Sequence, residues 1–244
     1  MNADFLALLA LLVAGHLLGD FVFQTNAMVR GKREARGPLR AHAAEIALVQ
    51  ALIVLPFFPS FVGLVCVLAI AVTHYFIDAG KLALDRRWPR PLTWFVLDQC
   101  AHVAVLLLAA LIWDVVADPI LFGNADSVAA CAWLAGVLAF NVNGGSAIVA
   151  ATLAQLRPAS DTRSADEGAA GAGRLIGILE RLLILFAVLA GEWAAVGLVL
   201  AAKSIARFKE LENRDFAELY LVGTLASVLV AVVSALALTR VLAL

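Results

Sequence analysis

Long apolar stretches separated by short polar segments make up almost the whole chain. A membrane-spanning helix needs about 20 mainly apolar residues, and on that criterion the pattern predicts about eight spans, at roughly 4–29, 41–57, 60–84, 92–112, 127–156, 173–190, 192–208 and 216–240. Very short separators part the second span from the third and the sixth from the seventh, so each of these pairs could be a tight helical hairpin. The expected fold is all-α, a polytopic membrane helix bundle of about eight transmembrane helices.

Lysine and arginine occur in alternate loops, and this alternation predicts the orientation. Basic residues follow the first, third, fifth and seventh spans, whereas Pro56–Ser60, Trp113–Asp126 and Gly191–Glu192 contain none. Because basic loops stay in the cytoplasm, both termini are expected on the non-cytoplasmic side. The small and polar residues of 157–173 predict a flexible cytoplasmic linker between a five-span bundle, 1–156, and a three-span segment, 174–244.

Composition excludes an ordinary soluble protein. Hydrophobic residues make up 63% of the chain and charged residues 15%, whereas soluble domains average about 45–50% and about 25%. The net charge of −1 gives no sign of a nucleic-acid partner. Cys66, Cys100 and Cys131 lie in apolar runs without paired spacing, so we interpret them as packing residues. The first apolar run lacks a basic start and is expected to be a membrane helix rather than a signal peptide.

Three histidines have an aspartate four positions away, a spacing that places both side chains on one helix face. The pairs are His16/Asp20, His74/Asp78 and Asp98/His102. The order is reversed in the third pair, and the span that carries it runs in the opposite direction. All three pairs should therefore place the carboxylate nearer the cytoplasm and the imidazole deeper in the membrane.

The cost of burying charge predicts that these pairs face inward and meet. An ionised side chain at the bilayer centre costs at least about 2.5–3.5 kcal/mol. Histidine and carboxylate together form a nitrogen–oxygen ligand set suited first to zinc, with iron or manganese as alternatives. The expected metal ligands are His16, His74, His102, Asp78 and Asp98, and the expected catalytic carboxylates are Asp20, Asp78 and Asp98. Two alternatives stay open: each pair could be a local hydrogen bond that neutralises itself, or the aspartates could only fix histidine tautomers.

Further polar residues are expected to bind substrate. Those of the first four spans are Gln24, His42, Lys81 and Gln99, and those of the last three are Arg174, Glu180 and Lys203. Glu180 and Lys203 should lie at similar depth, so a purely structural salt bridge is the alternative for this pair.

Several of these segments together resemble a known family. They are Gly15–Thr25, Thr73–Asp78 and Leu97–His102, followed by Gly173–Arg181, Ala202–Phe208 and Glu218–Thr224. The chain resembles a bacterial multi-pass membrane family labelled domain of unknown function 3307. The resemblance implies a bacterial inner-membrane protein and no established activity.

Three functions fit this pattern. The first is an intramembrane metal-dependent enzyme, hydrolase-like, that acts on a lipid or lipid-linked substrate with a spare aspartate as general base. The second is a membrane scaffold or sensor that binds a cytoplasmic partner through the basic loops. The third is a proton or metal-ion transporter, but the almost wholly apolar outer halves of the spans favour a one-sided cavity. The lipid bilayer is the one partner that the pattern requires, and the oligomeric state is left open.

Overall fold

The computed structural model describes residues 3–117, 121–156 and 167–242, and within them every regular element is a helix. The all-α prediction is confirmed. The chain divides into two compact units, Met1–Ala139 and Phe140–Leu244, which are described separately below.

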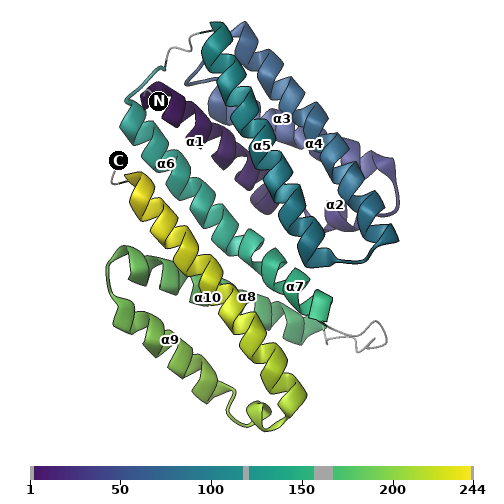
Figure 1. Cartoon of the computed structure of the whole chain (residues 1–244), viewed down its shortest axis with the longest axis vertical. Helices are drawn as coiled ribbons and strands as arrows, with labels where there is room; N and C mark the ends of the chain where they lie inside the picture. Colours follow the sequence, from purple (N-terminus) through teal and green to yellow (C-terminus); the bar gives the residue numbers. More distant parts are fainter. Residues whose placement is uncertain (1–2, 118–120, 157–166, 243–244) are drawn as a thin grey trace. The chain divides into compact units, whose positions relative to one another are not determined.

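The first unit surrounds an apolar core with long helices. Its elements are α1 (Ala3–Leu18), the π-helix η1 (Gly19–Phe23), α2 (Asn26–Gly31), α3 (Arg36–Val54), α4 (Phe61–Arg87), α5 (Pro91–Ala117) and α6 (Ala125–Ala139). Helix α1 packs against α3, α5 and α6 (Figure 1), and α4 packs against both α3 and α5. The core contains Leu8, Leu12, Leu106 and Trp113, each at most 1% exposed. Helix α1 is therefore enclosed by its neighbours, which places its polar residues inside the unit.

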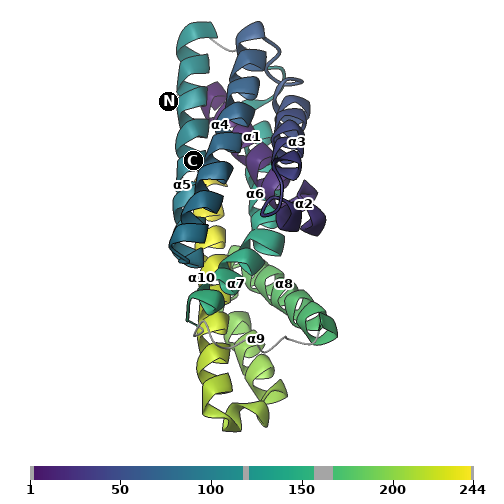
Figure 2. The ribbon, with the colours of Figure 1, turned by 90° about the vertical axis from the view of Figure 1, so that its right-hand side faces the viewer.

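The second unit consists of η2 (Phe140–Gly144), α7 (Gly145–Leu156), α8 (Glu167–Leu189), α9 (Trp193–Ala206), η3 (Glu210–Glu212) and α10 (Arg214–Leu242). Helix α10 packs against α7 and α8, and α9 packs against α8 (Figure 2). The turn between α8 and α9 requires Gly191, whose φ of 79° is left-handed.

The Arg181 side chain stabilises the π-helix η2 of the second unit. The side chain is 2% exposed. It donates hydrogen bonds to the backbone carbonyls of Asn141 and Val142, at 2.6 and 3.2 Å, and to the hydroxyl of Ser146, at 2.6 Å. Because the π-turn disturbs the regular backbone ladder, a buried guanidinium can satisfy these carbonyls. We therefore assign Arg181 a structural role.

Five helices are long and apolar enough to cross a membrane: Ala3–Phe23, Phe61–Arg87, Pro91–Ala117, Ala125–Leu156 and Arg214–Leu242. They correspond to the first, third, fourth, fifth and eighth predicted spans. The other three correspond to α3 and α8, which carry several charged residues, and to α9, whose 14 residues extend only about 21 Å. Eight spans are thus not confirmed, because charge and shortness separate these three helices from the rest.

The predicted linker falls largely on residues 157–166, which lie outside the described residues. Helix α8 begins at Glu167, so it covers the end of the range expected to be linker. The flexibility of the segment stays a prediction.

Gly63, in the first turn of α4, allows the close packing of α4 against α5. A Cβ atom there would lie 2.1 Å from the buried Trp113 ring. We expect Gly63→Ala to lower the free energy of unfolding by about 1–3 kcal/mol through overpacking. Gly80→Ala, on the same helix, meets nothing within 4 Å and should instead stabilise the protein by up to about 1 kcal/mol through helix propensity. Unfolding of both variants in detergent checks this, and equal effects would contradict it.

Candidate functional site

Four helices of the first unit each contribute one histidine to a single buried cluster. His16 comes from α1, His42 from α3, His74 from α4 and His102 from α5, and each is at most 3% exposed. The ring centroids are 4.9 Å apart for His42 and His74 and 4.1 Å apart for His74 and His102. The rings of His16 and His102 stack at 4.8 Å. The four imidazoles therefore form one continuous group, which we call the histidine cluster.

A π-turn at the end of α1 brings Asp20 into this cluster. The turn is closed by the backbone N–H of Gln24, which donates to the carbonyl of Gly19 at 3.0 Å. Gly19 allows α1 to approach α3, because a Cβ atom there would lie 2.5 Å from the Ile46 side chain. Single π-turns inside α-helices frequently occur at functional sites. Here the turn carries the Asp20 carboxylate towards α3 and α4.

Three atoms of the cluster form a compact triangle. The Nε2 atoms of His42 and His74 are 3.0 Å apart, and Asp20 Oδ1 lies 3.1 Å from the first and 3.3 Å from the second. In a tetrahedral zinc site with bonds of about 2.05 Å, neighbouring ligand atoms are about 3.3 Å apart. The Oδ2 atom of Asp78 lies 3.8 Å from His74 Nε2 and 4.0 Å from His42 Nε2. Small adjustments of this carboxylate would complete a fourth corner.

Hydrogen bonds outside the triangle orient two of the rings. His42 Nδ1 donates to Glu45 Oε2 at 3.3 Å, and His102 Nδ1 donates to the backbone carbonyl of Asp98 at 2.9 Å. A carboxylate and a carbonyl only accept hydrogen bonds, so in the neutral rings the proton is on Nδ1 and the lone pair is on Nε2. The Nε2 atom of His42 accepts a hydrogen bond from Gln24 Nε2 at 2.9 Å. Asp20 Oδ1, also an acceptor, lies 3.1 Å from the same Nε2 atom, so a proton or a cation is needed between them, and a metal ion there would displace the Gln24 hydrogen bond.

Two lysines neutralise part of the negative charge. Lys32 Nζ lies 2.6 Å from Asp78 Oδ2, and Lys81 Nζ lies 2.9 Å from Asp98 Oδ2. The carboxylates of the cluster are those of Asp20, Glu45, Asp78 and Asp98. With neutral imidazoles, four carboxylates and two ammonium groups leave two negative charges uncompensated. Buried charge needs a partner, and one divalent cation has the matching charge.

Some buried polar atoms beside the triangle have no hydrogen-bond partner. Two of them are the Nδ1 atom of His74 and the Oε1 atom of Glu45, and three more are the Nε2 atoms of His16 and His102 and the Oδ1 atom of Asp98. Unpaired buried polar atoms are rare in proteins and call for an explanation such as water, ion or ligand binding. The last three atoms are the groups best placed to contact a water molecule or a substrate next to the triangle.

The predicted site residues of the first unit are brought together. Gln99 Nε2 donates to Asp20 Oδ2 at 3.4 Å and to Asp98 Oδ2 at 3.2 Å, so it links the pairs of α1 and α5. His74 has ring contacts with all three other histidines, and His42, which the sequence assigned to substrate binding, lies inside the cluster with its Nε2 atom 3.0 Å from that of His74. The role of His42 and those of the other residues at substrate or metal stay predictions.

The three predicted substrate-binding residues of the last spans lie in the second unit. Glu180 and Lys203 form the expected salt bridge, with 2.6 Å between Oε2 and Nζ. Arg174 donates to the side-chain oxygen of Asn143 at 2.9 Å. These contacts give each residue a structural partner inside its own unit, and their contribution to substrate binding stays a prediction.

Sequence reasoning missed Lys32 and Glu45. Glu45 could have been found, because it follows His42 by three residues and so shares its helix face. Lys32 belongs to the basic loop that determined the predicted orientation, and nothing in its local sequence distinguishes it from its basic neighbours. Only the fold of α2 against α3 brings its ammonium group to Asp78.

The histidine cluster lies within a segment that matches a known family. The family model described as "Protein of unknown function (DUF3307)" matches residues 8–128. This segment of the chain belongs to the DUF3307 family. The DUF3307 segment holds all four histidines and the four carboxylates of the cluster, and the predicted resemblance is confirmed over this range. No curated protein and no solved structure matches the chain.

Proposed function

We propose that the chain is an intramembrane metal-dependent hydrolase that acts on a lipid or lipid-linked substrate. The observation that carries the proposal is the triangle of His42 Nε2, His74 Nε2 and Asp20 Oδ1, with edges of 3.0–3.3 Å. The ligand set keeps His74 and Asp78 from the sequence prediction and adds His42 and Asp20. Two imidazoles with carboxylate oxygens suit zinc first, and iron or manganese as alternatives.

The remaining polar groups fit the chemistry of hydrolysis. A metal ion in the triangle would make a bound water acidic and polarise the bond to be cleaved. Asp98, whose Oδ1 is free, accepts the proton of the attacking water and returns it to the leaving oxygen as the ester or phosphoester bond breaks. Lys81 holds the other oxygen of Asp98 in place. His102 and His16 offer free Nε2 atoms to the substrate.

We further propose that this is a multi-pass protein of the bacterial inner membrane, in which α3, α8 and α9 complete eight spans with both termini outside the cytoplasm. Helix α3 has 19 residues, about 28 Å, and packs against the apolar α1 and α4. The alternation of basic loops supports this topology. It places the histidine cluster in the cytoplasmic half of the bilayer.

The apolar core favours a one-sided site over a transport path. Beyond His16, towards the start of α1, the interior is filled by side chains such as Phe5, Leu8, Leu12 and Trp113. A proton or ion path needs polar groups or water along its length. Gln50 is a polar residue in this core, and its side-chain amide N–H donates a hydrogen bond to the backbone carbonyl of Leu12.

Elemental analysis of the detergent-purified protein tests the proposal. We expect about one divalent ion per chain in the wild type and almost none in the His42→Ala/His74→Ala double variant. Cys131→Ala, an exposed substitution on α6, is the matched control and should keep the metal. Size-exclusion profiles and helicity report whether each variant is folded. A metal-free wild type, or a folded double variant that keeps its metal, would contradict the proposal.

A further inference from the structure

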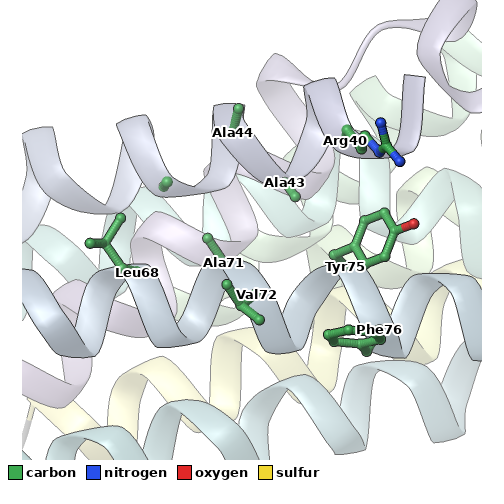
Figure 3. A pocket seen from close by; sticks show the side chains of 9 residues that line it. Arg40, Ala43, Ala44, Leu68, Ala71, Val72, Tyr75 and Phe76 are labelled. Atoms are coloured by element: carbon green, nitrogen blue, oxygen red, sulfur yellow. The ribbon is translucent and has the colours of Figure 1, made fainter. Parts of the chain in front are cut away.

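A groove of about 800 Å³ runs between α3 and α4 in the first unit. Figure 3 shows that α3 contributes mainly small side chains to the lining and α4 mainly larger ones. The lining residues are Ala43, Ala44, Ala47, Leu68, Ala71 and Val72, with Arg40, Tyr75 and Phe76. Val72 and Phe76 are 56% and 66% exposed, so the groove opens to the surroundings of the helices rather than to the core.

One end of the groove carries polar groups without protein partners. Figure 3 shows the Arg40 guanidinium and the Tyr75 hydroxyl at the same end, with Leu68 towards the other. Within the described part of the chain, neither group has a hydrogen bond or an ion pair. Arginine next to a hydroxyl donor is well suited to bind a phosphate oxygen pair. The groove therefore combines an apolar channel with a cationic end.

This end lies beside the histidine cluster in the two helices that form it. Arg40 precedes His42 by two residues on α3, and Tyr75 directly follows His74 on α4. The histidines are buried, whereas Arg40 is exposed and Tyr75 half-buried. A molecule whose phosphate is held by Arg40 and Tyr75 would thus have its polar part at the level of the cluster.

We propose that the groove binds one acyl chain of an anionic membrane phospholipid, with its phosphate on Arg40 and Tyr75. Most of the lining residues are apolar, as an acyl chain requires, and the volume is typical of a small-molecule site. The positive charge matches an anionic headgroup next to a basic loop. The lipid site does not depend on a metal ion, and it becomes the substrate site of the enzyme only where the proposed function holds.

The apolar groove and its cationic end contribute differently to lipid binding. An acyl chain that leaves other lipid tails gains no hydrophobic free energy, because both surroundings are apolar. The groove therefore provides shape, and selectivity must come from the headgroup. Anionic and zwitterionic lipids with identical chains should consequently differ in affinity, and the difference should depend on Arg40.

Native mass spectrometry of delipidated protein tests this. The probes are phosphatidylglycerol and phosphatidylcholine with the same palmitoyl and oleoyl chains, and glycerol phosphate as a headgroup without chains. We expect the wild type to bind phosphatidylglycerol about fivefold more tightly than phosphatidylcholine. Arg40→Gln should abolish this preference, and Ala44→Phe, which fills the groove, should weaken binding of both lipids. Arg36→Gln, at the start of the same helix but outside the groove, is the control and should bind like the wild type.

The outcomes separate this inference from the proposed function. Equal affinity of the wild type for both lipids, or an unchanged preference in Arg40→Gln, overturns the groove as an anionic-lipid site. If glycerol phosphate displaces phosphatidylglycerol at an equal concentration, the acyl chain does not contribute to binding, and the proposed role of the groove is overturned. Metal content is measured in the same samples. Metal without lipid selectivity refutes the lipid site alone, and lipid selectivity without metal refutes the enzyme alone.

Discussion

Asp20→Asn is expected to lower the affinity for a divalent metal by more than about 100-fold. Asparagine keeps the shape of the side chain but removes the charge of the oxygen that lies 3.1 and 3.3 Å from the two imidazole nitrogens. Loss of an outer partner that only orients a ligand already costs about 10–100-fold in affinity, and a direct ligand should cost more. Competition with a chromophoric zinc chelator on the solubilised protein measures the change.

Asp98→Asn is the matched comparison for this prediction. The substitution is the same, and the side chain is 2% exposed against 10% for Asp20, but its Oδ2 atom is paired with Lys81 and it lies outside the triangle. We expect this variant to keep the metal and to lose hydrolysis, because the amide cannot accept the proton of water. If both variants lost the metal equally, the triangle would have no special role, and a ligand set that includes Asp98 would replace it.

The inward direction of the three aspartates could be predicted from the sequence. The cost of exposing carboxylates to hydrocarbon and the spacing of four determine the helix face, and the reversed order of Asp98 and His102 determines the common level. These arguments use only periodicity and charge. The structure places Asp20, Asp78, Asp98 and their histidines in one cluster, as these arguments require.

The position of His42 inside the cluster could not be predicted in the same way. It has no aspartate at a spacing of four, and its helix begins in a basic segment, so the sequence assigned it only to substrate binding. Its burial follows from the packing of α3 on α1 and α4. The π-turn at Gly19–Phe23 was equally hidden, because one irregular turn leaves the apolar pattern of α1 almost unchanged.

The number of membrane spans is limited as a sequence prediction by the polar residues that some helices carry. Apolar length identifies α1, α4, α5, α10 and the helix Ala125–Leu156 with little ambiguity. Helix α3 carries the polar residues Arg40, Glu45 and Gln50 along its length. These residues reduce the hydropathy on which a span prediction depends, and a helix of this kind is left out when spans are selected by length and apolar composition.

Lys32→Met is the second substitution with a large expected effect, and it acts on stability. Lys32 Nζ lies 2.6 Å from Asp78 Oδ2, and the side chains are 9% and 10% exposed. Removing one partner of a buried ion pair leaves an uncompensated charge and costs about 3–5 kcal/mol. We therefore expect the metal-free variant to lose about 3–5 kcal/mol of unfolding free energy, measured by reversible unfolding in mixed micelles. Arg30→Met, an exposed change in α2 two residues before Lys32, is the control and should have little effect.

The effect of added zinc on the stability of Lys32→Met tests whether a cation binds beside Asp78. Without the Lys32 ammonium the cluster has one more uncompensated negative charge, so a dication should bind more tightly to the variant than to the wild type. A ligand that binds only the folded state stabilises it in proportion to its affinity. The stability difference between variant and wild type should therefore shrink when zinc is present. A difference that zinc leaves unchanged would mean that the lysine supports packing alone and that no cation binds beside Asp78.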